Sequence, residues 1–133
     1  MRRAGRAVAI CAALVLARGA AAQEETLLLP SGLEVRLQEV LTDRPGDGLV
    51  YRFRFYAEDF VLSDAVLESV LADLTWLCER YALSRLPVIG PQPSRIVISL
   101  ADKPSEFGVY DPDVIQVFES FSPQGGACVW ELY

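Results

Sequence analysis

The sequence contains no histidine among its 133 residues. This absence excludes Ser–His and Cys–His nucleophile pairs, histidine-based zinc sites and acid–base catalysis by an imidazole. The chain also lacks a Gly-rich phosphate-binding loop and a CxxC redox pair. Its one lysine, Lys103, precedes a proline in a predicted turn, which is a poor setting for a desolvated catalytic amine. The sequence therefore predicts no catalytic residue, no metal and no cofactor.

Carboxylates are the only plentiful acid–base groups. Glu106, Glu119 and Glu131 lie on or near the predicted C-terminal strands, and such a pair can hydrolyse a glycosidic bond if burial raises the pKa of one member. Their spacing selects no pair, so a small carboxylate-dependent hydrolase stands only as an alternative. Asp111 and Asp113 lack the spacing of a calcium-binding EF-hand loop, which favours a helix cap or an acidic turn.

Long apolar runs are scarce, and the main one lies at the N-terminus. Three arginines precede the apolar run 7–17, and Ala20 and Ala22 then stand in the small-x-small spacing that signal peptidase accepts. The pattern predicts a secretion signal over residues 1–22, cleaved after Ala22, and one mature domain over 23–133. The alternative is a membrane anchor, which needs roughly 20 apolar residues. A cleaved signal predicts a periplasmic or secreted protein with no membrane span.

Positive charge is also scarce. The chain has 12 basic and 18 acidic residues. Four arginines and no acids lie in residues 1–22, so the mature net charge is 8 − 18 = −10. This balance argues against nucleic acid and against anionic membrane surfaces, which both attract clustered Lys and Arg. A periplasmic protein or a small anion remains as a partner class.

Two cysteines, Cys78 and Cys128, remain once Cys11 leaves with the signal. An even number in an oxidising compartment predicts one disulfide. The bridge between Cys78 and Cys128 would close a loop of about 50 residues. In the chain-entropy model, closing such a loop stabilises the fold by about 4 kcal/mol. Two separate buried thiols are the alternative.

Hydrophobic periodicity predicts an N-terminal β-hairpin and one long helix. Residues 33–41 alternate apolar and polar, and so do residues 49–56, with a Pro- and Gly-rich turn between them. Leu67 to Tyr81 carry a continuous helical stripe, which predicts a helix over roughly 64–83 with Ser63 or Asp64 as its N-cap. Pro87 prevents its continuation.

The C-terminal half predicts two or three further strands. Residues 95–100 are almost continuously apolar, as in a strand buried on both faces. Residues 115–122 fit either a strand or a helix, and the strand is favoured because 127–133 would form the second arm of a hairpin. The predicted fold is α+β: an antiparallel sheet with the helix packed on one face.

The outward face of the N-terminal hairpin carries the candidate binding residues. If Leu41 pairs with Leu49, Arg36 lies opposite Arg54 and Gln38 opposite Arg52. Like charges opposed in a sheet destabilise it unless they are neutralised. Pairing with Glu34, Glu119 or Glu131 is one answer. The other is an anion or an acidic partner bound by Arg36, Arg52 and Arg54, with Tyr56 beside them.

Several short segments of the chain together carry a resemblance to a known family. They include Tyr51-Arg52-Phe53-Arg54-Phe55, Gly90-Pro91-Gln92-Pro93-Ser94, Pro104-x-Glu106-Phe107-Gly108 and Cys128-Val129-Trp130-Glu131. On these residues the chain resembles a family of small exported alphaproteobacterial proteins classed as a domain of unknown function. The resemblance implies export and a single domain, and it adds no activity or site residue. A non-catalytic binding or accessory module is the leading hypothesis, and a structural envelope protein without a discrete site is a further alternative.

Overall fold

The computed structural model describes residues 5, 25–44, 46 and 48–131. The predicted signal over residues 1–22 therefore lies, except for Gly5, outside the described residues. The elements in chain order are β1 (Thr26–Leu28), β2 (Glu34–Asp43), β3 (Val50–Tyr56), α1 (Leu67–Trp76), a π-helical turn (Leu77–Ala82), a 3₁₀ turn (Leu83–Arg85), β4 (Arg95–Ala101), β5 (Gln116–Gln124) and β6 (Ala127–Trp130). Within the described residues, no helix is both long enough and apolar enough to cross a bilayer.

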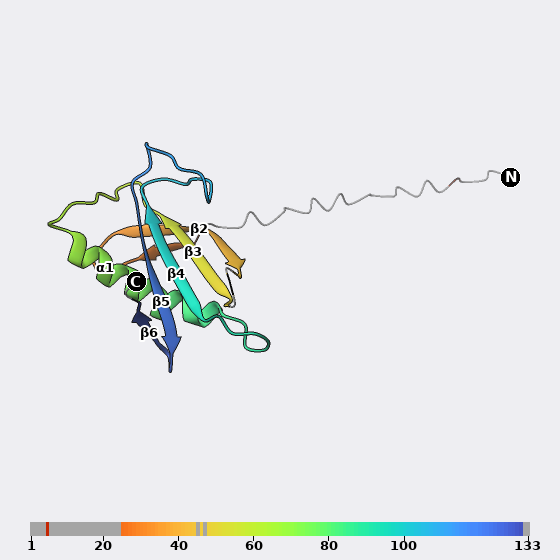
Figure 1. Cartoon of the computed structure of the whole chain (residues 1–133). Coiled ribbons are helices and arrows are strands. Elements are labelled where there is room, and N and C mark those ends of the chain that lie inside the picture. The colour runs from red at the N-terminus through yellow and green to blue at the C-terminus, as the bar shows by residue number, and fades with distance from the viewer. Residues whose placement is uncertain (1–4, 6–24, 45, 47, 132–133) are drawn as a thin grey trace.

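A curled six-stranded sheet in the order β1-β2-β3-β4-β5-β6 carries the helix on one face (Figure 1). We call the helix-covered side the inner face and the other side the outer face. The α+β layering is as predicted, but the sheet is mixed, because β3 and β4 pair in parallel. The physical reason is the helix itself: it crosses the sheet and returns the chain to the end where β3 began. β1 was not predicted.

A β-bulge shifts the register of the first hairpin. Arg36 lies opposite Tyr56 and Leu37 opposite Phe55, but after the bulge Glu39 lies opposite Arg54. The predicted pairings of Arg36 with Arg54 and of Gln38 with Arg52 are wrong, because the strands pair from Asp43 and Val50 instead of from Leu41 and Leu49. The extra residue re-aims the rest of β2, so that an acid rather than a like charge faces Arg54.

The helix begins later than predicted. Its first turn starts at Leu67, with Val66 rather than Ser63 or Asp64 at the N-cap position, and the π-helical and 3₁₀ turns extend it without a break to Arg85. Leu67 is exposed, although the stripe predicted it to be buried. The apolar core positions on this segment are Val70, Leu74, Leu77, Cys78, Tyr81 and Ala82.

Asp73 is a helix carboxylate that is buried. The backbone N–H of Ser31 donates to one of its carboxylate oxygens at 3.1 Å, and the Ser31 hydroxyl donates to the other. These two bonds offset the cost of burying a carboxylate. They also attach the turn between β1 and β2 to the helix.

The predicted disulfide between Cys78 and Cys128 is present, with an S–S distance of 2.03 Å. It joins the π-helical turn to β6 and lies at the edge of the inner-face core. The backbone N–H of Cys128 also donates to the Glu79 carboxylate at 3.2 Å. The last strand is therefore held to the helix by one covalent bond and one charge-assisted hydrogen bond.

Tyr81 connects the end of the helical segment to Glu25, the residue that precedes β1. Its hydroxyl donates to Glu25 at 3.2 Å, and Glu25 also accepts two hydrogen bonds from Arg85 at 3.1 Å. The Arg85 guanidinium lies 3.4 Å from the centre of the Tyr81 ring. Burial raises the pKa of the Tyr81 hydroxyl above its usual value, and Arg85 opposes part of that rise.

Residues 116–122 form a strand, as favoured from the sequence for 115–122. β5 runs on to Gln124, which pairs with Ala127, so the hairpin turns at Gly125 and Gly126. Both glycines have positive φ, 58° and 82°, as two-residue hairpin turns of this type require. Asp111, considered as a helix cap, instead accepts a hydrogen bond from the Asp113 N–H at 2.9 Å in a tight acidic turn.

Candidate functional site

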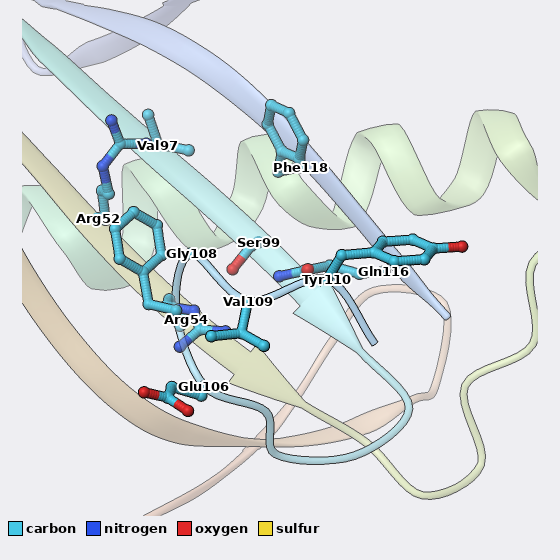
Figure 2. Close-up of a pocket in the computed structure, with 11 residues that line it drawn as sticks. Arg52, Arg54, Val97, Ser99, Glu106, Gly108, Val109, Tyr110, Gln116 and Phe118 are labelled. Carbon is cyan, nitrogen blue, oxygen red and sulfur yellow. The ribbon is translucent and has the colours of Figure 1, made fainter. Parts of the chain in front are cut away.

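A cleft of about 280 Å³ lies on the outer face, between β3, β4, β5 and the loop 102–115. Figure 2 shows side chains from both the strands and the loop around it. The lining residues are Arg52, Arg54, Val97, Ser99, Glu106, Phe107, Gly108, Val109, Tyr110, Gln116 and Phe118. Polar groups from the sheet thus meet aromatic groups from the loop.

The loop that forms one wall of the cleft is fixed at two places. At its neck, the Asp102 N–H donates to the carbonyl of Ile115 at 3.0 Å, and the Ile115 N–H returns a bond to the Asp102 carboxylate, also at 3.0 Å. Further along, Ser105 exchanges hydrogen bonds with the side-chain amide of Gln38, the bulged residue of β2. Since both ends of the wall are held, the cleft is largely pre-formed.

Arg54 is the buried centre of this arrangement. It is 5% exposed and forms an ion pair with Glu39, the residue that the bulge brings opposite it. It also donates to the carbonyl oxygen and the hydroxyl of Ser105, both at 3.1 Å. Arg54 therefore positions the loop, and its removal would loosen the cleft as well as change its charge.

Arg52 stands nearer the rim of the cleft, with its side chain 25% exposed. Its Nε–H donates to Asp43 at 3.2 Å. The guanidinium carbons of Arg52 and Arg54 lie 5.4 Å and 5.5 Å from the centre of the Phe107 ring. Phe107 therefore contacts both cations, an interaction that favours a fixed ring position.

Ser99 places a hydroxyl group in the floor of the cleft. The residue is 6% exposed, and its Oγ has no hydrogen-bond partner among the described residues. In Figure 2 this oxygen points from β4 toward the space beneath the loop, near Val109. A buried hydroxyl without a partner costs free energy. No described residue supplies a hydrogen bond to the Ser99 hydroxyl, so the packing of the fold does not offset this cost.

Apolar groups form the rest of the cleft. Val97 lies in the floor and is buried, whereas Phe107 is 49% exposed and Phe118 is 59% exposed. Val109 and Tyr110 continue the exposed apolar surface along the loop. Exposed aromatic side chains beside a partly buried polar floor are typical of a surface that binds a ligand or partner.

The structure divides the four predicted binding residues into two pairs. Arg52 and Arg54 line the cleft, while Arg36 and Tyr56, which face each other across β2 and β3, border a separate hollow of about 100 Å³ with Glu34, Glu58 and Asp59. The expected neutralising acids also differ. Glu39 and Asp43 pair with the cleft arginines, in place of Glu34, Glu119 or Glu131.

The three carboxylates considered for hydrolysis lie in three places. Glu106 borders the cleft. Glu119 accepts a hydrogen bond from the indole N–H of Trp130 beside the helix, and Glu131 forms an ion pair with Arg95 at 2.9 Å. The fold does not assemble two of these acids at one site.

Sequence reasoning missed Ser99, Phe107 and Phe118. Ser99 interrupts an otherwise apolar strand, which is the one signal that could have indicated it. Phe107 and Phe118 lie on a loop and on an outward strand position, and neither feature identifies a site without knowledge of the topology. Only the parallel pairing of β3 with β4 places Arg54 beside Ser99.

Comparisons with known proteins give a family and no function. The chain belongs to a family of unknown function, DUF6497, which it matches over residues 10–133. This agrees with the resemblance to a family of unknown function that the sequence phrases suggest. Comparison with curated proteins and comparison with solved structures gave no match.

Proposed function

We propose that this chain is an exported, non-catalytic binding module, and that its ligand binds through an anionic group in the outer-face cleft at Arg52 and Arg54. The observation that carries the proposal is a pre-formed cleft in which two guanidiniums contact one aromatic ring beside a buried hydroxyl without a partner among the described residues. Small size, the missing histidine and the dispersed carboxylates favour binding over catalysis.

Arg52 is the residue that we propose contacts the ligand. An arginine carries five N–H donors, and the Nε–H of Arg52 is the one that Asp43 takes. The ion pair with Asp43 fixes the side chain and leaves its outer N–H groups available to an acceptor. Planar guanidinium groups bind carboxylates and phosphates in this way. Arg54, by contrast, serves mainly to position the loop.

Export is supported by the N-terminal pattern of arginines, apolar run and small residues, and it is compatible with the disulfide. The test is to express the full chain in a bacterium and to determine the N-terminus of the protein in the periplasmic fraction. We expect the N-terminus to be Gln23. Recovery of the intact chain from the cytosol, with Cys78 and Cys128 as free thiols, would contradict export.

Binding is tested by following the backbone amide resonances of the exported protein during titration with acetate, inorganic phosphate and hydrocinnamate. At least one anion should shift the resonances of the Val97–Ser99 and Phe107–Tyr110 segments in a saturable way. Arg52→Gln should weaken this binding about tenfold or more, because it removes a charge-assisted hydrogen bond. Arg95→Gln is the matched control, since Arg95 is also an ion-paired arginine but lies outside the cleft lining. Equal effects of the two variants, or no saturable shift with any anion, would overturn the proposal.

A further inference from the structure

We infer that the ligand of the outer-face cleft is a small carboxylic acid with a single aromatic or similarly sized apolar group. This inference rests on the proposed function and narrows the ligand class. It follows from three properties of the cleft: its size, the exposed apolar side chains of its walls and the polar groups of its floor and rim.

The volume limits the ligand. Clefts that take drug-sized molecules typically measure about 300–1,000 Å³, and this cleft measures about 280 Å³. It suits one ring with a short chain better than a sugar chain, a nucleotide or a long acyl chain. The loop that forms one wall is held at Ser105 and at the Asp102–Ile115 neck, so the space is defined before a ligand enters.

The walls select an apolar group. Phe107 from the loop and Phe118 from β5 both border the cleft and are about half exposed, and Val97 forms an apolar part of the floor. Aromatic rings prefer offset or edge-to-face contact with another ring. A ligand ring between the loop and β5 would cover the exposed parts of both phenylalanines and remove them from water.

The floor and rim select an acceptor group. Ser99 has a buried hydroxyl without a partner among the described residues, and the register places Ser99 beside Arg54 and Val97 beside Arg52. A carboxylate near Val97 can accept from the Ser99 hydroxyl through one oxygen and from the Arg52 guanidinium through the other. This arrangement would supply the hydrogen bond that Ser99 lacks.

Ser120 provides a control that the structure itself contains. Its hydroxyl is likewise buried and likewise lacks a partner among the described residues, and it lies opposite Val97 on β5. Ser120 is not among the residues that line the cleft. The two serines therefore share burial and lack of a partner but differ in access to the ligand.

The test compares four probes on the exported protein by calorimetry and amide-resonance titration. Hydrocinnamate has both ring and carboxylate, hydrocinnamide has the ring with an uncharged carboxamide in place of the carboxylate, and acetate has the carboxylate alone. Hydrocinnamate should bind at least tenfold more tightly than either of the other two. N-acetyl-Ala-Ala-Phe distinguishes the two sources of the same chemistry: tighter binding than hydrocinnamate assigns the site to a peptide C-terminus, and weaker binding assigns it to a free acid.

Two pairs of variants test the contacts. Ser99→Ala should weaken hydrocinnamate binding about fivefold or more, whereas Ser120→Ala should leave it unchanged. Phe118→Ser should weaken hydrocinnamate and leave acetate unchanged, and Val129→Ser, also a partly exposed apolar residue on the outer face, should have no effect. The same small loss in Ser99→Ala and Ser120→Ala would exclude the proposed role of Ser99.

The failures of the two proposals are distinguishable. If acetate or phosphate binds in the cleft as tightly as hydrocinnamate and depends on Arg52, the aromatic-acid inference falls and the anion-binding module stands. Hydrocinnamide binding as tightly as hydrocinnamate would likewise overturn the carboxylate assignment. If none of the probes shifts the cleft resonances, both proposals fall.

Discussion

The two faces of the sheet solve different problems with adjacent residues of the same strands. On the inner face, Phe53, Phe55, Ile98 and Leu100 pack against the helix and are fully buried. On the outer face, Arg54 and Ser99 are nearly as buried, but their neighbours are a loop, an ion pair and an open cleft. Burial of apolar side chains on the inner face stabilises the fold. Burial of polar groups on the outer face costs free energy, which offsets part of that stabilisation. The comparison teaches that burial alone does not separate core from site.

Loss of the disulfide should have the largest effect. The double variant Cys78→Ala/Cys128→Ala frees the last strand from the helix, and we expect unfolding free energy to fall by about 4 kcal/mol. Urea unfolding of the variant and of the oxidised wild type measures the difference. The outer-face cleft should keep its anion binding at low urea, because neither cysteine is among the residues that line the cleft. A loss below 1 kcal/mol would show that the inner-face packing holds β6 unaided.

Truncation of one side chain on each face tests the comparison directly. Leu77→Ala should lower the unfolding free energy by about 2–5 kcal/mol, because it leaves a cavity in the inner-face core. Phe118→Ala removes a larger side chain that is largely exposed, and its effect should stay within about 0.5 kcal/mol. Thermal or urea unfolding gives both values. Equal losses would mean that the outer-face aromatics are structural.

High pH should weaken the contact between Glu25, Tyr81 and Arg85. The folded-state pKa of Tyr81 is raised above its ordinary value of 10.0, so the unfolded chain loses this proton first. The protonated Tyr81 hydroxyl therefore makes its whole contribution to the free energy of unfolding below pH 10. This contribution falls as the pH rises from 10 toward the folded-state pKa, with a slope of at most about 1.4 kcal/mol per pH unit. Tyr81→Phe should show a constant loss of about 1 kcal/mol at neutral pH from the missing hydrogen bond and a weaker decline above pH 10. A parallel decline in both proteins would refute the assignment to Tyr81.

Removal of either buried serine hydroxyl should have a small effect of the opposite sign. Ser99→Ala and Ser120→Ala each remove a buried hydroxyl that has no partner among the described residues, so each should leave stability unchanged or raise it by up to about 1 kcal/mol. Chemical unfolding measures this. A loss of more than 1 kcal/mol in Ser99→Ala would show that the hydroxyl has a bonding role within the folded chain, which would remove the argument for a ligand there.

Several features were open to prediction because they depend on local pattern. The alternation in residues 33–41 and 49–56 predicted β2 and β3, and the helical stripe predicted α1 and its extension. The even number of cysteines in the predicted mature chain predicted the disulfide between Cys78 and Cys128. Errors arose in the register. The two strands pair from Asp43 and Val50 instead of from Leu41 and Leu49, and one bulge in β2 adds a further shift, so the neighbours assigned to Arg52 and Arg54 were wrong.

By itself, the sequence determined the helix and every strand except β1, which cysteines join, and that an imidazole takes no part in any chemistry, because periodicity and composition are local properties. Tertiary structure alone decided that β3 and β4 run in parallel, that the loop 102–115 folds over the outer face, and that Arg54, Ser99 and Phe107 meet there. Ser99 lies 45 positions (99 − 54) and Phe107 lies 53 positions (107 − 54) after Arg54 in the chain. Contacts over such separations follow from strand order and register, which no local pattern specifies.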